Sequence, residues 1–267
     1  MRPLYGIVAR ELLRFLRQRG RLWSSLARPF VWLLLAGTGF AAVFAGHDQL
    51  DYRRFMAPGL LGMVVLFGAF LASLSTVVDR DAGVLRLLLV APIQRAAVVL
   101  GKVLGAAVLG TAQALVVGLI LVPAVGLRPG ATELLLTGSG IVLASLATAA
   151  LGLALATTMH SLENFATVMN FVVFPMLFLS GALYPMQHLG GWLRVLAYLN
   201  PLAYGVDLLK HGLLGPWAGS GYGGEWPVAL DVLALSGCAV VCFVVASLLI
   251  AREGGVLRAA LTSARDG

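Results

Sequence analysis

Charged residues are scarce in this sequence, and they leave long stretches of the chain uninterrupted. Only 12% of the 267 residues are charged and 60% are hydrophobic, whereas ordinary soluble domains are about 25% charged. The apolar runs are also longer than those of a soluble α/β domain, which polar residues interrupt every few positions. The composition therefore excludes an ordinary soluble domain and predicts a polytopic membrane protein.

The sequence also lacks the residue patterns of common catalytic and nucleotide-binding sites. It contains no phosphate-binding loop of the form Gly-x-x-x-x-Gly-Lys-Ser/Thr, no Cys/His cluster with zinc spacing and no Gly-x-Ser-x-Gly turn. Its two cysteines, Cys238 and Cys242, lie in one apolar run, which favours helix packing over a metal site. An activity that consumes energy would therefore depend on a partner that binds the nucleotide.

Six uncharged runs dominate the sequence, and each is near the roughly 20 residues that cross a bilayer as a helix. They cover residues 29–45, 56–78, 103–127, 134–159, 165–186 and 232–251. No acidic residue lies within these runs, which argues against the proton relay of a secondary transporter. The predicted fold class is an all-α polytopic membrane protein with six transmembrane helices.

The first 28 residues carry seven arginines and one acidic residue. On a helical wheel, one narrow face holds Arg10, Arg14, Arg17 and Arg21, and apolar side chains fall opposite. This pattern favours an amphipathic helix in the membrane interface, with its arginines toward anionic headgroups. Two alternatives stay open: a basic leader that only sets the topology, and a cleaved signal peptide that ends near residues 43–45.

The distribution of lysine and arginine predicts the orientation of the chain. If the N-terminus is cytoplasmic, 14 of the 19 basic residues fall on the inner side and 5 on the outer side. Acidic residues divide equally between the two sides, so the cations carry the bias, as the positive-inside rule requires. Both termini are therefore expected to be cytoplasmic. The net charge of +7 reflects these topology signals rather than a surface for nucleic acid.

The longest charged interruption in the first half of the chain spans residues 79–102. Within it, the leucine-rich residues 84–90 are closed by Ala91 and Pro92, because proline cannot continue a helix and disfavours helical geometry in the preceding residue. The segment predicts a helix of about two turns on the cytoplasmic face. Such a short apolar helix is suited to being gripped by a partner, and an inert surface loop is the alternative.

The outer segment at residues 185–228 is rich in aromatic residues and is broken by proline and glycine. Tyrosine and tryptophan prefer the membrane interface, and irregular backbone at membrane depth must be covered by protein. We therefore expect short re-entrant helices at residues 191–199 and 203–214.

Small residues and a short turn mark the second half of the transmembrane region. A ridge at a spacing of four is formed by Ala144, Thr148, Gly152 and Ala156, which favours close helix packing over substrate contact. The turn at residues 160–164 faces the cytoplasm in the predicted topology. It is either a second contact for a partner or an ordinary capped turn.

Three stretches, in this order on six predicted spans, resemble the permease subunits of ATP-binding-cassette type-2 exporters, the group that contains bacterial drug-resistance and nodulation permeases. The first stretch runs from Arg10-Glu11 to Arg28-Pro29. The second runs from Pro58-Gly59 to Leu104 and includes Asp79-Arg80-Asp81-Ala-Gly and Ala91-Pro92-Ile93. The third includes Glu163-Asn164-Phe165, Phe174-Pro175, the Leu-Ser-Gly-Ala-Leu-Tyr-Pro of residues 179–185 and the Asn-Pro-Leu-Ala-Tyr-Gly of residues 200–205. The resemblance covers roughly residues 5–250, and the family often has Glu or Leu where this chain has Asp81 and Val84.

The resemblance implies a complex in the bacterial inner membrane. Two permease copies among membrane lipids, as a homodimer or with a paralogue as the second permease, would associate with two copies of a soluble ATPase subunit, which would bind ATP and Mg²⁺; this chain would hold no cofactor and bind no nucleic acid. The residues implied to couple to the ATPase are Asp79, Arg80, Asp81, Gly83, Val84, Leu85, Arg86, Leu87, Leu88, Ala91, Pro92, Ser161 and Glu163. The residues implied to line the substrate path are Phe67, Phe70, Met169, Asn170, Phe171, Phe174 and Phe178.

The expected organisation is a cytoplasmic interfacial helix at residues 1–28, a transmembrane domain at 29–251 and a cytoplasmic tail at 252–267. The transmembrane domain would contain a coupling helix within residues 80–95 and the outer re-entrant segment at 185–228. The leading hypothesis is an exporter subunit for amphipathic, lipid-linked or drug-like cargo that does not itself hydrolyse nucleotide. The alternatives are a membrane scaffold or assembly factor that moves nothing, and an intramembrane lipid-modifying enzyme, which would need more polar residues inside the spans.

Overall fold

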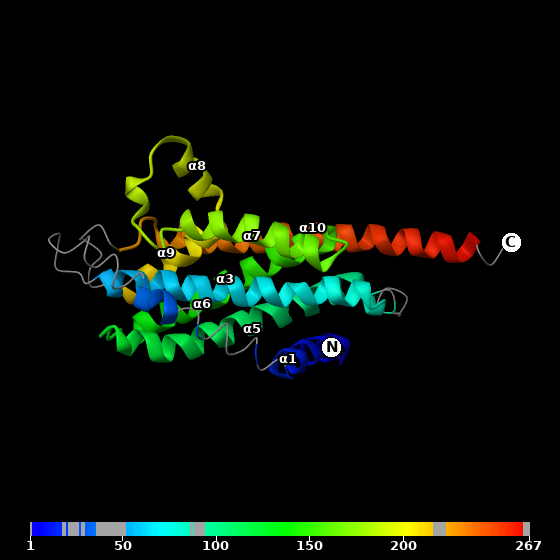
Figure 1. Cartoon of the computed structure of the whole chain (residues 1–267), viewed down its shortest axis with the longest axis horizontal. Coiled ribbons are helices and arrows are strands. Elements are labelled where there is room, and N and C mark those ends of the chain that lie inside the picture. The colour runs from blue at the N-terminus through cyan, green and yellow to red at the C-terminus, as the bar shows by residue number, and fades with distance from the viewer. Residues whose placement is uncertain are drawn as a thin grey trace.

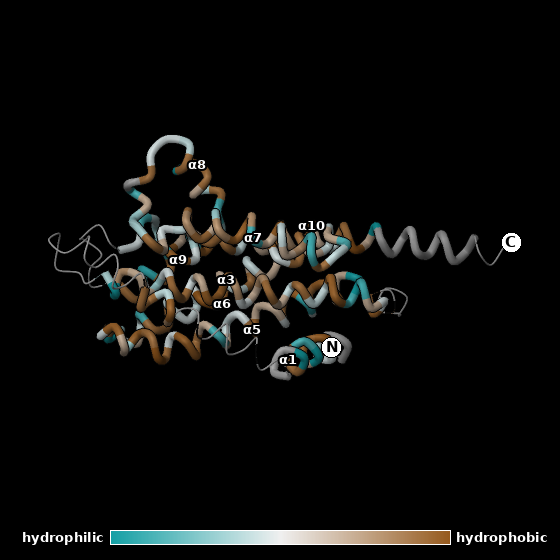
Figure 2. Tube along the Cα trace, in the orientation of Figure 1, coloured by the Kyte–Doolittle hydropathy of each residue, from teal (hydrophilic) through white to brown (hydrophobic). Residues whose placement is uncertain are grey.

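The computed structural model describes residues 2–17, 20, 27, 30–35, 52–85, 87, 94–215 and 223–263. Four helices in this part of the chain are long and apolar enough to cross a membrane, and they lie side by side along the long axis of the molecule (Figure 1). They are α3 (Tyr52–Asp81), α5 (Arg95–Ala124), α6 (Ala131–Thr158) and the first part of α10 (Val228–Ser263). Hydrophobic residues dominate their middle sections (Figure 2). Four of the six predicted spans thus correspond to long apolar helices.

The fifth predicted span, residues 165–186, is not one continuous helix. The helix α7 (Leu162–Phe178) ends early and is followed by a turn and the short 3₁₀ helix η1 (Met186–His188). Pro175 lies near its C-terminal end and cannot donate a backbone hydrogen bond, and Gly181 then adopts a φ of 71°, which glycine tolerates best. The first predicted span, residues 29–45, lies mostly outside the described residues. Within this span, residues 30–35 are described, and they are helical.

Two short helices, α8 (Gly191–Leu199) and α9 (Pro201–Leu213), form one end of the molecule (Figure 1). The prediction of short helices in this segment is confirmed. Asn200 begins α9 because its side-chain oxygen accepts the Leu202 N–H at 3.1 Å. Its Nδ2 also donates to the Met176 carbonyl at 2.7 Å, which fixes the start of α9 to the end of α7.

The helix α6 lies at the centre and contacts α3, α5, α9 and α10. The ridge of Ala144, Thr148, Gly152 and Ala156 is buried in these contacts. A Cβ atom added at Gly152 would lie 2.8 Å from Ser73 Oγ, so α3 and α6 approach as closely as a glycine permits. The predicted packing role of the small-residue ridge is therefore confirmed.

Candidate coupling site

The N-terminal helix α1 (Arg2–Arg17) is seated against α5, and two glycines of α5 admit it. A Cβ atom added at Gly101 would lie 2.8 Å from Ile7 Cγ2, and one at Gly105 would lie 3.1 Å from Glu11 Cβ. Ile7 and Glu11 are both buried. The predicted amphipathic helix therefore exists, and part of it packs on protein.

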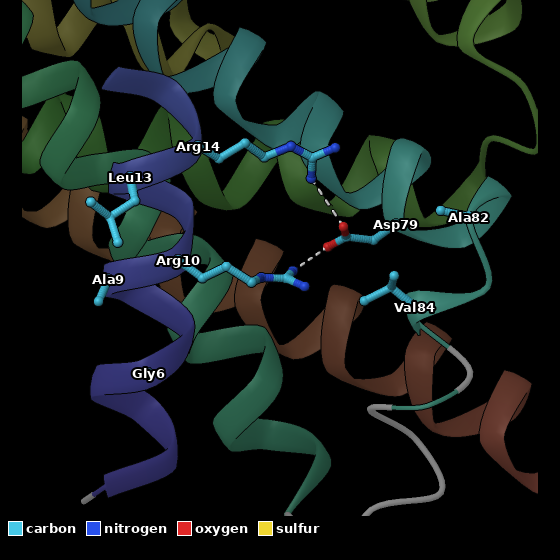
Figure 3. A pocket seen from close by; sticks show the side chains of 8 residues that line it. All are labelled: Gly6, Ala9, Arg10, Leu13, Arg14, Asp79, Ala82 and Val84. Carbon is cyan, nitrogen blue, oxygen red and sulfur yellow. Dashed lines mark hydrogen bonds and ion pairs between the residues drawn. The ribbon is translucent and has the colours of Figure 1, made fainter. Parts of the chain in front are cut away.

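A buried carboxylate at the end of α3 holds α1 and α5 together. Asp79 accepts hydrogen bonds from Arg10 Nη2 at 2.5 Å, from Arg14 Nη1 at 3.0 Å and from Lys102 Nζ at 2.6 Å. Lys102 Nζ also lies 3.4 Å from Glu11 Oε1. Figure 3 shows Arg10 and Arg14 reaching from α1 to Asp79. We call these five residues, Arg10, Glu11, Arg14, Asp79 and Lys102, the ion cluster.

The burial of the ion cluster makes each of its charges dependent on the others. The side chains of Asp79 and Lys102 are 4% and 1% exposed. Taking such ions out of water is costly, and their attraction offsets this cost only when the pairing is close and complete. Three cations face two carboxylates, so the cluster is nearly neutral. The ion cluster connects three helices, α1, α3 and α5, through Asp79.

The neighbouring Arg80 connects α3 to the end of α6. Its guanidinium donates to the carbonyl oxygens of Ala156 and Thr157, at 3.2 and 2.8 Å, and to that of Met159. These carbonyls lie at the C-terminal end of α6, where carbonyl oxygens lack the usual helical N–H partner four residues on. A cation is also favourable at the negative end of a helix dipole. Arg80 therefore ties the end of α3 to the turn between α6 and α7.

Residues 84, 85 and 87 are the described part of the predicted coupling helix, and they follow Asp79 and Arg80 in the chain. Leu85 is 2% exposed and belongs to the core, whereas Leu87 is 73% exposed. Asp81 is exposed, and Gly83 turns the chain with a φ of 73°. Val84 lines a groove of about 740 Å³ between α1 and the end of α3 (Figure 3). The other predicted residues of this helix, Arg86, Leu88, Ala91 and Pro92, lie outside the described residues.

The structure differs from the predicted arrangement of charges around the coupling helix. The resemblance implies that Asp79 and Arg80, with Asp81 and Arg86, form a charged rim where the coupling helix meets the ATPase. Instead, Asp79 points into the ion cluster, and Arg80 binds the end of α6. Both residues fix the start of the coupling segment, because their charges are paired with groups of this chain.

The turn before α7 combines a cap with exposed residues. Ser161 Oγ accepts the Asn164 N–H at 3.2 Å and so begins α7, as the capping interpretation predicts. Glu163 is exposed in the first turn of α7, where a negative charge is favourable. A contact with a partner at this turn stays a prediction.

The residues proposed for the substrate path do not share one environment. Phe70 is 1% exposed and packs with Phe165 in the core, their ring centroids 6.4 Å apart. Phe67 and Met169 are half-buried, and Asn170 is exposed. Phe171 is 80% exposed, and Phe174 and Phe178 are also exposed. Three aromatic residues of α7, Phe171, Phe174 and Phe178, therefore form an exposed apolar face, whereas Phe70 packs in the core.

A second charged cluster, at the opposite end of the molecule, was missed from the sequence. Lys210 of α9 is buried and lies 3.8 Å from Glu225. Burial lowers the pKa of Lys210 below its ordinary value, and the carboxylates of Glu225 and Asp207 oppose that shift. Lys210 and Asp207 inside an apolar segment were the available signal, but the partner Glu225 lies 15 residues further on, beyond the end of α9.

Comparisons with known proteins identify relatives over most of the chain. A family model described as "ABC-2 type transporter" matches residues 3–214. A transport permease of Porphyra purpurea is 28% identical over 79% of this chain and 74% of its own length. Nodulation protein J of Rhizobium leguminosarum bv. viciae is 26% identical over 72% of this chain and 74% of its own length. The multidrug ABC transporter permease YbhR of Escherichia coli K12 is 32% identical over 61% of this chain and 45% of its own length.

Proposed function

Because the chain belongs to the ABC-2 type transporter family, we propose that it is the membrane subunit of an exporter driven by a separate ATPase. Two ATPase subunits would bind ATP and Mg²⁺ on the cytoplasmic side and act on two copies of this chain in a bacterial inner membrane. The carrying observation is Leu87, an exposed leucine that follows two anchors in the chain, the buried Asp79 and the half-buried Arg80. Both termini would lie in the cytoplasm.

The anchors supply a route from the coupling segment to the spans. A force on residues 84–90 would reach α1 and α5 through Asp79, because that carboxylate binds Arg10, Arg14 and Lys102. The same force would reach the end of α6 through Arg80. A nucleotide-driven change in the ATPase could then favour one of two arrangements of the bundle. The coupling free energy equals the difference between the binding free energies of the ATPase for the two arrangements.

The exposed aromatic face of α7 supports a role in substrate movement. Phe171, Phe174 and Phe178 leave a large apolar area uncovered within one chain. In the proposed homodimer, the second copy would cover part of this face and leave an aromatic-lined path. Such a path suits amphipathic, lipid-linked or drug-like cargo. Relatives named for multidrug transport and nodulation are compatible with this class of cargo.

The test is the effect of Leu87→Asp on the association with the ATPase. Burying a leucine side chain contributes about 1.5–3 kcal/mol, which corresponds to roughly 10- to 150-fold in affinity. We expect Leu87→Asp to abolish co-purification of the ATPase from solubilised membranes, and the matched Leu87→Met variant to retain it. Equal recovery of the ATPase with both variants would contradict the proposal. An ATPase that binds the wild-type chain but hydrolyses ATP no faster in its presence would favour the scaffold instead.

A further inference from the structure

Three potential metal ligands meet at the predicted outer end of the bundle. Asp207 and His211 lie one turn apart on α9, and Asp231 lies in the first turn of α10. Their ligand atoms all lie within 4.8 Å of one another. His211 Nε2 is 3.7 Å from Asp207 Oδ2 and 4.0 Å from Asp231 Oδ2. Ligand atoms about 2.1 Å from a tetrahedral ion stand about 3.4 Å apart, so small side-chain adjustments would complete the geometry.

Asp231 supplies an independent sign that a cation is needed. Its side chain is 0% exposed, and neither carboxylate oxygen has a hydrogen-bond partner among the residues that the structure describes. Buried polar atoms are almost always partnered, and an isolated buried carboxylate is very costly. This carboxylate therefore requires either a proton or a metal ion.

The charge of the surroundings favours a divalent ion. Three carboxylates, those of Asp207, Glu225 and Asp231, gather near one ammonium group, that of Lys210. With His211 neutral, as a metal ligand must be, these groups carry a net charge of about −2. One divalent cation would neutralise them.

The surrounding backbone holds two of the three ligands in place. Asp207 accepts the N–H groups of Glu225 and Trp226 at 2.7 and 3.0 Å, which leaves further lone pairs on its oxygens. His211 Nε2 lies 2.7 Å from the Trp226 carbonyl oxygen. A Cβ atom added at Gly224 would lie 2.1 Å from His211 Nε2, so the backbone closes over the imidazole ring. The two backbone hydrogen bonds to Asp207 orient that ligand, as supporting contacts do in known metal sites.

We propose that Asp207, His211 and Asp231 bind one divalent cation of the zinc class, which ties α9 to the start of α10. The mixed nitrogen and oxygen ligand set is suited to Zn²⁺, and Co²⁺ is a spectroscopic substitute of similar preference. To bind the ion, His211 Nε2 would release the proton that it donates to the Trp226 carbonyl oxygen.

The experiment uses the purified full chain, stripped with a chelator and dialysed against Zn²⁺ or Co²⁺. We expect about one equivalent of metal per chain, visible Co²⁺ absorption bands and a melting temperature that the chelator lowers. His211→Gln should bind at least 10-fold more weakly and lose the chelator effect, and Asp231→Asn should do the same. His160→Gln, which alters an exposed group at the other end, should match the wild type.

Two results would overturn the proposal. One is binding by the wild type that His211→Gln does not weaken. The other is a melting temperature of the wild type that the chelator leaves unchanged while Asp231→Asn raises it, which would mean that the two carboxyl groups share a proton. His211 is 23% exposed, so His211→Gln is expected to fold. If Asp231→Asn does not fold, His211→Gln still decides the test.

Discussion

Replacing Asp79 by asparagine removes one negative charge from the centre of the ion cluster and leaves its shape almost unchanged. The buried Lys102 ammonium then keeps only the 3.4 Å contact with Glu11 as a charged partner. Arg10 and Arg14 are about a third exposed and can turn to water. The cost therefore falls mainly on the stranded lysine. Removing one partner of a buried ion pair costs about 3–5 kcal/mol, and we expect a loss of this size in the free energy of unfolding.

The assay is denaturant or thermal unfolding of the purified chain, combined with limited trypsin cleavage after Arg14. Asp79→Asn should both destabilise the protein and expose α1 to trypsin, because α1 loses its link to α3. The matched control is Asp81→Asn, which removes the same charge from an exposed residue of α3. This control should change the free energy of unfolding by less than about 0.5 kcal/mol.

A double variant separates the stranded charge from other effects. When Lys102→Met accompanies Asp79→Asn, no unpaired ammonium remains, so the loss should be smaller than the sum of the two single losses by about 1–3 kcal/mol. Additive losses, or a value for Asp79→Asn equal to that of Asp81→Asn, would refute the account of the ion cluster.

Three further predictions concern other parts of the chain. Arg80→Gln should cost about 1.5–3 kcal/mol locally and accelerate hydrogen exchange in the turn between α6 and α7, whereas Arg194→Gln should leave that exchange unchanged. Gly59→Ala should destabilise by about 1–3 kcal/mol, because its Cβ would lie 2.4 Å from a carbonyl oxygen after α7; Gly138→Ala, which meets nothing within 4 Å, should be neutral or slightly stabilising in unfolding assays. Leu87→Cys should react with an impermeant maleimide in inverted vesicles but not in right-side-out vesicles, and the reverse pattern would invert the predicted topology.

The helices that local signals mark could be predicted from the sequence. Long uncharged runs placed α3 and α6 within about four residues of their bounds, because length and composition alone decide whether a helix can cross a bilayer. The run that predicted α5 began eight residues after Arg95, because charged residues continue that helix beyond the apolar run. Asn200 followed by proline is a local start signal for α9, since a cap and a first-turn proline act locally, although we expected this helix to begin at residue 203. The early end of α7 was missed because Pro175 lies within an otherwise uninterrupted apolar run.

The ion cluster could not be predicted, because it depends on pairs of residues far apart in the sequence. Arg10 and Asp79 are 69 positions apart, and Glu11 and Lys102 are 91 apart. A single sequence shows that these residues flank apolar runs but not which partner each will meet. The resemblance places Arg80 in a charged rim for the partner, and its bonds to the carbonyls at the end of α6 are visible only in the structure.

The most direct test of the coupling account places a photo-crosslinking amino acid at position 87 and irradiates native membranes that contain the complete transporter. The account predicts one dominant adduct between this chain and the nucleotide-hydrolysing subunit, with a yield that changes when ATP is added. The same group at position 199, an exposed leucine at the predicted outer end, should give no such adduct. Absence of the adduct from position 87, in membranes where the two subunits co-purify, would contradict the account.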